Sequence, residues 1–79
     1  MQLTVRYFAI LREQAGESEE TLETSAVTPA ELYEEIAASR GFTLGQDLLK
    51  VSVNESFVTM DHVLKDGDAV VFIPPVAGG

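Results

Sequence analysis

Apolar and polar residues alternate along the first residues of the chain. The apolar positions Leu3, Val5 and Tyr7 fall on one face of an extended segment, with polar residues between them. This period of two predicts a strand over residues 2–8 with one buried face. Phe8 breaks the pattern, because this strand would place its ring on the polar face.

Two helices are predicted, a short one over residues 9–15 and a longer one after residue 28. The short helix is expected to turn Ile10 and Leu11 inward and to stop at Gly16. The longer helix begins with a capping hydroxyl, a proline at the first helical position and a glutamate three residues after the cap. The start is marked by Thr28, Pro29 and Glu31, the apolar face by Leu32, Tyr33 and Ile36, and the end by Gly41.

The remaining segments predict strands and turns. Residues 17–25 are acidic but alternate around Leu22, residues 50–54 and 69–73 are apolar strands, and residues 57–58 follow a tight turn. The inward residues of these strands are Val51, Val53, Val70 and Phe72, and a loop carrying Phe42, Leu44, Leu48 and Leu49 is expected to cover one end of the core. One main helix across a four- or five-stranded sheet buries these faces, so we predict an α+β fold.

The same alternation predicts an exposed apolar patch. If Val70 and Phe72 face the helix, Ile73 faces away from it, on the same side of the sheet as Phe8. Phe57 is expected to join them. A single helix cannot cover both faces of a sheet, and exposed apolar patches often mark protein–protein surfaces. A partial cover by the chain's own loops is the alternative.

Composition narrows the functional classes. The chain has 79 residues, 13 acidic and 5 basic side chains, a net charge of −8 and no cysteine. This length fits one domain. The absence of cysteine excludes thiolate nucleophiles, cysteine metal sites and disulfides, and is compatible with a reducing compartment. The negative charge argues against nucleic acids and anionic membranes and favours partners with a basic face. Neither a signal peptide nor a membrane-spanning stretch is predicted.

Few side chains suggest chemistry. His62 is the only histidine, and its neighbour Asp61 makes no triad, so a role in a turn is expected. The Asp66-Gly67-Asp68 segment lacks the spacing of a calcium loop and indicates a turn. Four glutamates at positions 17, 19, 20 and 23 are expected to form a solvated face, with weak calcium binding as the alternative. We therefore predict no metal site and no built-in active site.

The C-terminal end differs from the rest. Residues 74–79 begin with two prolines, which cannot continue a sheet, and end in two glycines. We predict a domain over residues 1–73 and an extended tail over residues 74–79. Such a tail is thin enough to enter a narrow tunnel, and its terminal carbonyl has no Cβ beside it.

With this pattern in view, several segments resemble the small subunit of molybdopterin synthase, a family with the ubiquitin-like β-grasp fold. The matching segments are Val5–Glu13 (VRYFAILRE), Val53-Asn54, Asp61-His62, Leu64–Asp68 and Phe72–Gly79. Two departures are visible: Ile73 stands where an aromatic residue is commoner, and Val63 stands where proline is common. Both replacements are conservative.

The resemblance implies a sulfur carrier rather than an enzyme acting alone. Gly79 would be adenylated with ATP by an E1-like adenylating enzyme and converted to a thiocarboxylate by a sulfur donor. The large subunit of molybdopterin synthase would receive the tail in a heterotetramer, where sulfur passes to cyclic pyranopterin monophosphate. The carrier itself would bind no cofactor and would be cytoplasmic. The expected partner-binding residues are Phe8, Arg12, Phe57, Ile73, Pro75, Val76, Ala77 and Gly78.

Three other functions stay open at this point. The first is a sulfur carrier of another pathway, of the thiamine-thiazole type, which shares the fold and the Gly-Gly end. The second is a ubiquitin-like protein modifier, joined through Gly79 to lysines. The third is a binding module that uses only the apolar patch.

Overall fold

The computed structural model describes residues 1–75 and contains one five-stranded sheet. The elements along the chain are β1 (Gln2–Tyr7), α1 (Ala9–Ala15), β2 (Glu19–Glu23), α2 (Pro29–Arg40), η1 (Gln46–Leu48), β3 (Lys50–Val53), β4 (Ser56–Val58) and β5 (Ala69–Ile73). The strand order is β2-β1-β5-β3-β4, with β1 and β5 parallel and the other neighbours antiparallel. The predicted mixed sheet with one main helix is confirmed.

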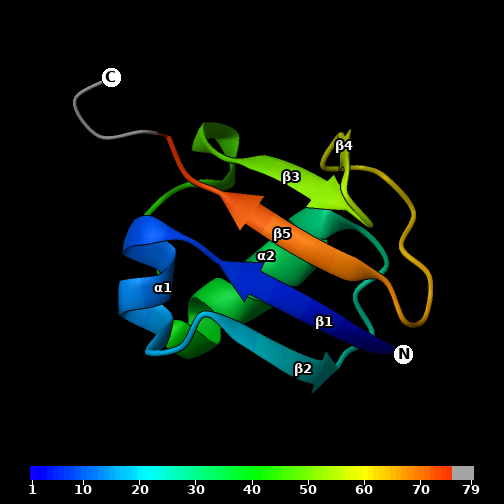
Figure 1. Cartoon of the computed structure of the whole chain (residues 1–79), viewed down its shortest axis with the longest axis horizontal. Coiled ribbons are helices and arrows are strands. Elements are labelled where there is room, and N and C mark those ends of the chain that lie inside the picture. The colour runs from blue at the N-terminus through cyan, green and yellow to red at the C-terminus, as the bar shows by residue number, and fades with distance from the viewer. Residues whose placement is uncertain (76–79) are drawn as a thin grey trace.

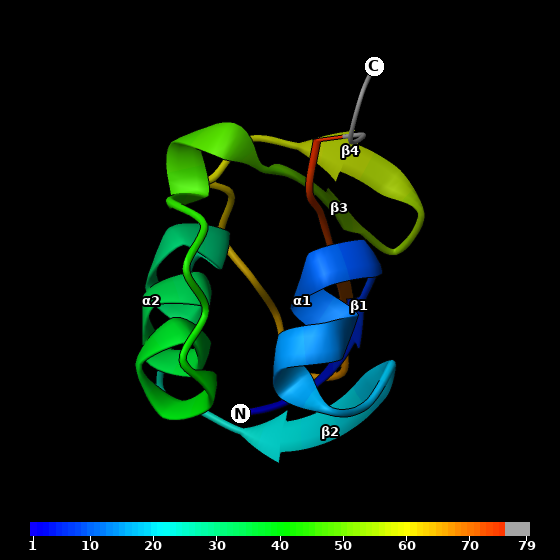
Figure 2. The same ribbon diagram turned by 90° about the vertical axis from the view of Figure 1, so that its left-hand side faces the viewer.

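Helix α2 crosses one face of this sheet (Figure 1), and the view from the side shows η1 and the loop that follows α2 in the same layer (Figure 2). The core lies between the two layers. The residues that the alternation predicts to be inward are buried as expected: Leu3, Val5, Tyr7, Val51, Val53, Val70 and Phe72, together with Leu32, Tyr33 and Ile36 of α2. We call the opposite face of the sheet the open face.

Local signals set the ends of α2. The Thr28 hydroxyl accepts a hydrogen bond from the Glu31 N–H at 3.2 Å, as the capping pattern predicts. The Glu31 carboxylate accepts from the N–H of Val27, one residue before the cap. The helix ends at Gly41, whose φ of +74° is left-handed and costs glycine no steric strain.

Two predictions about buried residues are wrong. Leu11 is fully buried, but Ile10 is 38% exposed. Successive helical residues are rotated by about 100°, so two neighbours cannot both face a narrow core. In the loop after α2, Phe42, Leu44 and Leu49 pack against the core, whereas Leu48 lies in η1 and is 54% exposed.

The ring of Phe42 closes the end of the core. It lies 5.5 Å from the Tyr7 ring, edge to face, and 5.8 Å from the Tyr33 ring. The Tyr33 hydroxyl donates to the carbonyl of Leu44 at 2.7 Å, which ties the loop to α2. The loop therefore covers this end of the core, as predicted. In residues 1–75, no helix is long and apolar enough to cross a membrane.

Candidate functional site

The parallel pairing of β1 and β5 places the ends of these two strands at the same edge of the sheet. Tyr7 is the partner of Phe72 in the register, so the next residues along each strand, Phe8 and Ile73, leave the sheet side by side. Figure 1 shows the end of β5 beside α1 at this edge. The segment in which the predicted tail begins therefore leaves the sheet next to Phe8, although the two are far apart in the sequence.

A groove of about 550 Å³ lies at this point, and we call it the tail groove. Its walls come from α1 and its preceding residue on one side and from the end of β5 on the other. The lining residues are Phe8, Ala9, Ile10, Arg12, Glu13, Ile73, Pro74 and Pro75. Phe8 is 42% exposed, Ile73 is half-buried, and Pro74 is buried at the root of the tail. The predicted apolar patch is thus a groove with one cationic and one anionic side chain.

The backbone around Phe8 holds its ring at the groove. Phe8 is extended, with φ −127° and ψ 154°, and its carbonyl accepts a hydrogen bond from the N–H of Leu11 at 3.1 Å. Ala9 then turns the chain with φ +52°, a left-handed conformation that is uncommon for a residue with a Cβ. Because Leu11 is anchored in the core, this turn directs Phe8 outward.

Phe57 lies on the open face but not in the tail groove. The register aligns Arg6, Val71, Ser52 and Phe57 across the sheet, so the Phe57 ring points to the same side as Val71. It is 72% exposed and lines a second groove, of about 510 Å³, along β3 and β4. Two strand spacings of about 4.8 Å separate β4 from β5. The structure therefore joins Phe8, Arg12, Ile73 and Pro75 and leaves Phe57 at the far side of the face.

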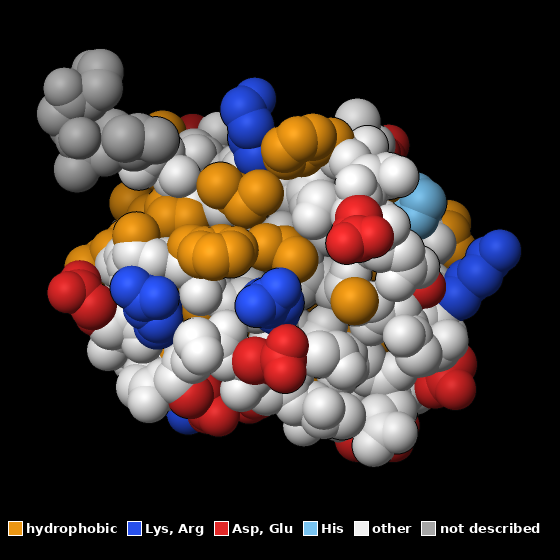
Figure 3. All heavy atoms as spheres, viewed as in Figure 1, with side chains coloured by type: hydrophobic (Ala, Val, Ile, Leu, Met, Phe, Trp, Pro, Cys, Tyr) orange, Lys and Arg blue, Asp and Glu red, His pale blue; other side chains and the backbone are white. Residues whose placement is uncertain are grey.

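Hydrophobic side chains gather on the open face, and Lys and Arg side chains lie around them (Figure 3). Most of the described carboxylates belong to β2 and to the α2 layer, and of those on β2 Glu19 and Glu23 share the open face with Arg6 and Gln2. The sequence prediction included Arg12 in this region but neither Arg6 nor Lys50. Their positions in the alternation, opposite Val71 and Ile73, are the signal that could have found them.

The other end of β5 is held by polar contacts that have a structural role. The Asp68 carboxylate accepts from the Asn54 amide and from the Lys65 N–H, both at 2.8 Å. The Asp66 carboxylate accepts from the Gln2 N–H at 2.7 Å, and Gly67 has φ +87°. The Asp66–Asp68 turn prediction is confirmed, and these motif residues build no site near the tail.

The four glutamates of the acidic segment are each matched to a cation. Arg40 donates to Glu17 at 2.6 Å and to Glu20 at 2.7 Å, Arg6 lies 3.4 Å from Glu19, and the N-terminal amine lies 3.0 Å from Glu23. This pairing leaves no shared cluster for a cation, and residues 1–75 contain no group of three metal-ligating side chains.

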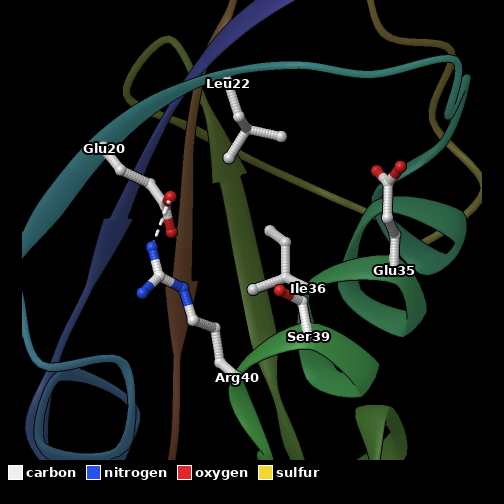
Figure 4. Close-up of a pocket in the computed structure, with 6 residues that line it drawn as sticks. All are labelled: Glu20, Leu22, Glu35, Ile36, Ser39 and Arg40. Atoms are coloured by element: carbon white, nitrogen blue, oxygen red, sulfur yellow. Dashed lines mark hydrogen bonds and ion pairs between the residues drawn. The ribbon is translucent and has the colours of Figure 1, made fainter.

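A small cavity of about 260 Å³ between β2 and α2 contains the Glu20–Arg40 pair (Figure 4). Glu20 also accepts a hydrogen bond from the Tyr7 hydroxyl at 2.5 Å. Burial, and then this hydrogen bond, raise the pKa of Tyr7 far above its usual value of 10.0. The hydrogen bond to Glu20 raises the pKa of Arg40 as well. Neither Tyr7 nor Arg40 changes charge near neutral pH. The Glu20–Arg40 ion pair therefore links β2 to α2 and has a structural role.

His62 lies in a turn, as predicted. The backbone N–H of His62 donates to the backbone carbonyl of Thr59 at 3.1 Å, and the Thr59 hydroxyl donates to the carboxylate of Asp61. The predicted tail residues Val76, Ala77, Gly78 and Gly79 lie outside the described residues, and the boundary of the predicted tail at residue 74 stays a prediction.

Comparison with known proteins adds independent information. A model of the ThiS family matches residues 5–79. The molybdopterin synthase sulfur carrier subunit of Escherichia coli is 35% identical, over 98% of this chain and 99% of that protein. The subunit of the same name from Chlamydomonas reinhardtii is 39% identical, over 100% of both chains.

Among solved structures, the chain is similar to the complex of subunits 1 and 2 of the molybdopterin-converting factor from Helicobacter pylori. The matched chain has a TM-score of 0.68 and 25% identity, with 100% of both chains covered.

Proposed function

The chain belongs to the ThiS family, and we propose that it is the sulfur carrier subunit of a molybdopterin synthase. The observation that carries the proposal is the identity of 35–39%, over nearly the full length, to subunits of that name. The Gly-Gly end and the tail groove support it, because both are features that a carrier needs. A carrier of the thiamine-thiazole type and a protein modifier are the competing functions, and mass spectrometry and reconstitution distinguish them from the proposed one.

The proposed chemistry takes place at the terminal carboxylate of Gly79. A carboxylate is a poor electrophile, so one of its oxygens first attacks the α-phosphorus of ATP, and pyrophosphate leaves. An E1-like partner would catalyse this step. A donor then supplies sulfur at the oxidation level of sulfide, AMP leaves with the activated oxygen, and a thiocarboxylate remains on Gly79.

The second half of the proposal is delivery. The thiocarboxylate enters the large subunit of the synthase, and its sulfur passes to cyclic pyranopterin monophosphate while water restores the carboxylate. The two terminal glycines have no side chains to obstruct entry or attack. We place these steps in the cytoplasm. In this proposal the general base and the phosphate-binding groups belong to the larger partner.

The tail groove supplies the docking surface in this proposal. Phe8, Arg12 and Ile73 lie within one groove, at the root of the tail. A partner that binds there holds the domain next to the point where the tail begins. Docking and insertion are then coupled, because binding the domain raises the local concentration of the tail at the partner's entrance. Phe57 would contact the partner only through a footprint wide enough to reach β4.

Mass spectrometry of the protein from its native cell tests the carrier chemistry. Replacement of one oxygen by sulfur adds about 16 Da to the intact mass. We expect this species in the wild type under sulfur-replete conditions and expect it to be absent when Gly79 is deleted. A conjugate to lysines of other proteins would indicate a modifier instead.

Reconstitution tests the pathway. The thiocarboxylated chain is mixed with the large subunit and cyclic pyranopterin monophosphate, and molybdopterin is measured. A variant with one residue added after Gly79 is measured in parallel, and we expect it to form no molybdopterin while its melting temperature stays unchanged. Wild-type activity of this extended, uncleaved variant would refute the mechanism. A thiocarboxylated wild type that forms no molybdopterin would point to another pathway.

A further inference from the structure

The basic residues of the chain are distributed unevenly. Three of the five, Arg6, Arg12 and Lys50, belong to the open face or its edge. Arg12 lines the tail groove, Lys50 is the register partner of Ile73, and Arg6 is the register partner of Val71. Figure 3 shows Lys and Arg side chains around the hydrophobic atoms of this face.

Arg12 and Lys50 lie on opposite sides of Ile73. The sheet order β1-β5-β3 puts Ile73, on β5, between Lys50 on β3 and the α1 helix that follows β1 and carries Arg12. Within residues 1–75 neither of these two side chains takes part in an ion pair, whereas Arg6 pairs with Glu19 and Arg40 pairs with two glutamates. Both are exposed. They are therefore available to a partner that covers the groove.

The face as a whole is close to neutral. Glu13 lines the tail groove, and Glu19 and Glu55 line a polar groove beside Val71. Glu23, the register partner of Gln2, also lies on this face, where it pairs with the N-terminal amine. Four carboxylates therefore face three basic side chains, and seven of the eight net negative charges reside on the rest of the protein. The open face and the α2 face are separated along the shortest dimension, 18 Å. At physiological salt the Debye length is about 8 Å, so a docked partner interacts mainly with the charges of the open face.

We infer that the open face selects a partner surface in which an apolar side chain enters the tail groove and carboxylates lie opposite Arg12 and Lys50. This inference rests on the proposed function and specifies its docking partner. It differs from what the net charge predicts by itself, which is a partner with a basic face. Arg12 and Lys50 act as specificity determinants: a basic surface would leave them facing like charges, while an acidic surface pairs both.

Binding of the unmodified chain to the purified large subunit tests the inference, because no sulfur chemistry is then needed. The variants Arg12→Glu and Lys50→Glu each change the charge by two. Lys65→Glu makes the same change in the turn at the opposite end of β5 and is the matched control. Association rates and Kd are measured at about 150 mM and about 500 mM salt, and circular dichroism checks that each variant is folded.

We expect Arg12→Glu and Lys50→Glu to weaken binding at least tenfold at the lower salt, chiefly through slower association, and to lose part of this defect at the higher salt. The Kd of Lys65→Glu should stay within about twofold of the wild-type value, because a distant exposed charge has only a weak effect on binding. Equal Kd values for all three variants, or tighter binding by the first two, would overturn the inference.

The remaining outcomes separate the two proposals. A defect in only one of the two variants would exclude the other residue as a determinant. If the large subunit does not bind the wild type, both the proposed partner and the inference fail. If Gly79 carries no thiocarboxylate in the cell but binding follows the predicted charge dependence, the sulfur chemistry fails while the docking surface stands.

Discussion

The buried hydroxyl of Tyr7 should make the stability of this protein fall at alkaline pH. Tyr7 is 1% exposed, and its hydroxyl donates to Glu20, which Arg40 also binds. Burial and the Glu20 hydrogen bond raise the pKa of Tyr7 in the folded state, so the folded protein keeps this proton above pH 10. The unfolded chain releases the proton near pH 10.

The sign and size follow from this difference. Below pH 10 both states are protonated and the stability contribution is intact. Above pH 10 Tyr7 ionises only in the unfolded state, so its contribution to the free energy of unfolding falls by about 1.4 kcal/mol by pH 11. For a chain of 79 residues the whole free energy of unfolding is about 4–12 kcal/mol, so a loss of this size is measurable.

Urea unfolding of the wild type and Tyr7→Phe at pH 8 and pH 11 measures the effect. At pH 8 the variant should be less stable by about 2 kcal/mol, because the hydrogen bond to the Glu20 carboxylate is lost. At pH 11 this difference should shrink by about 1.4 kcal/mol. Thr28→Ala is the control: it removes the α2 cap, costs about 1 kcal/mol and titrates nothing, so its difference should not change. A constant difference for Tyr7→Phe would refute the reasoning.

Three further outcomes are expected. Phe8→Asp or Ile73→Asp should weaken binding to the large subunit by at least about 2 kcal/mol. Val63→Asp, at a residue 67% exposed in the loop between β4 and β5, should leave the affinity unchanged. Equal affinities of all three variants in titration calorimetry would exclude the tail groove as the docking site. Gly16→Ala should lower the free energy of unfolding in urea by about 1 kcal/mol, because φ is +81° while the space around the added methyl is open. Ala9→Gly should raise the free energy of unfolding by about 0.5–1 kcal/mol, because glycine adopts the φ of +52° without strain. The same variant should bind the large subunit more weakly, because the backbone holds Phe8 less firmly. A loss of stability would contradict the strain at Ala9.

Much of the fold could be predicted because its signals are local. The alternation at Leu3, Val5 and Tyr7 identifies a strand and its inward face within one segment. The Thr28 cap is equally local, since the hydroxyl and the N–H that it binds are three residues apart. The prediction for Ile10 and Leu11 was wrong in part, because two adjacent apolar residues do not indicate which of them a short helix turns inward.

The candidate site could be predicted only in part. Phe8 and Ile73 were expected on one face, and the structure confirms this through the pairing of Tyr7 with Phe72. The same face was expected to unite Phe57 with them, but the sheet order inserts β3 between β5 and β4. Parity decides the face of a residue, while the order of strands decides its neighbours, and strand order depends on contacts between distant segments.

The sequence by itself therefore determined which residues of the strands are inward and where α2 begins and ends. Only the tertiary structure decided that the ends of β1 and β5 meet, that Arg12 and Lys50 flank Ile73, and that the glutamates of residues 17–23 are matched to Arg40, Arg6 and the N-terminal amine. The physical reason is range. Periodicity and capping act within a few residues. The tail groove and the charges around it are made by distant segments that meet only when the strands pair into the sheet.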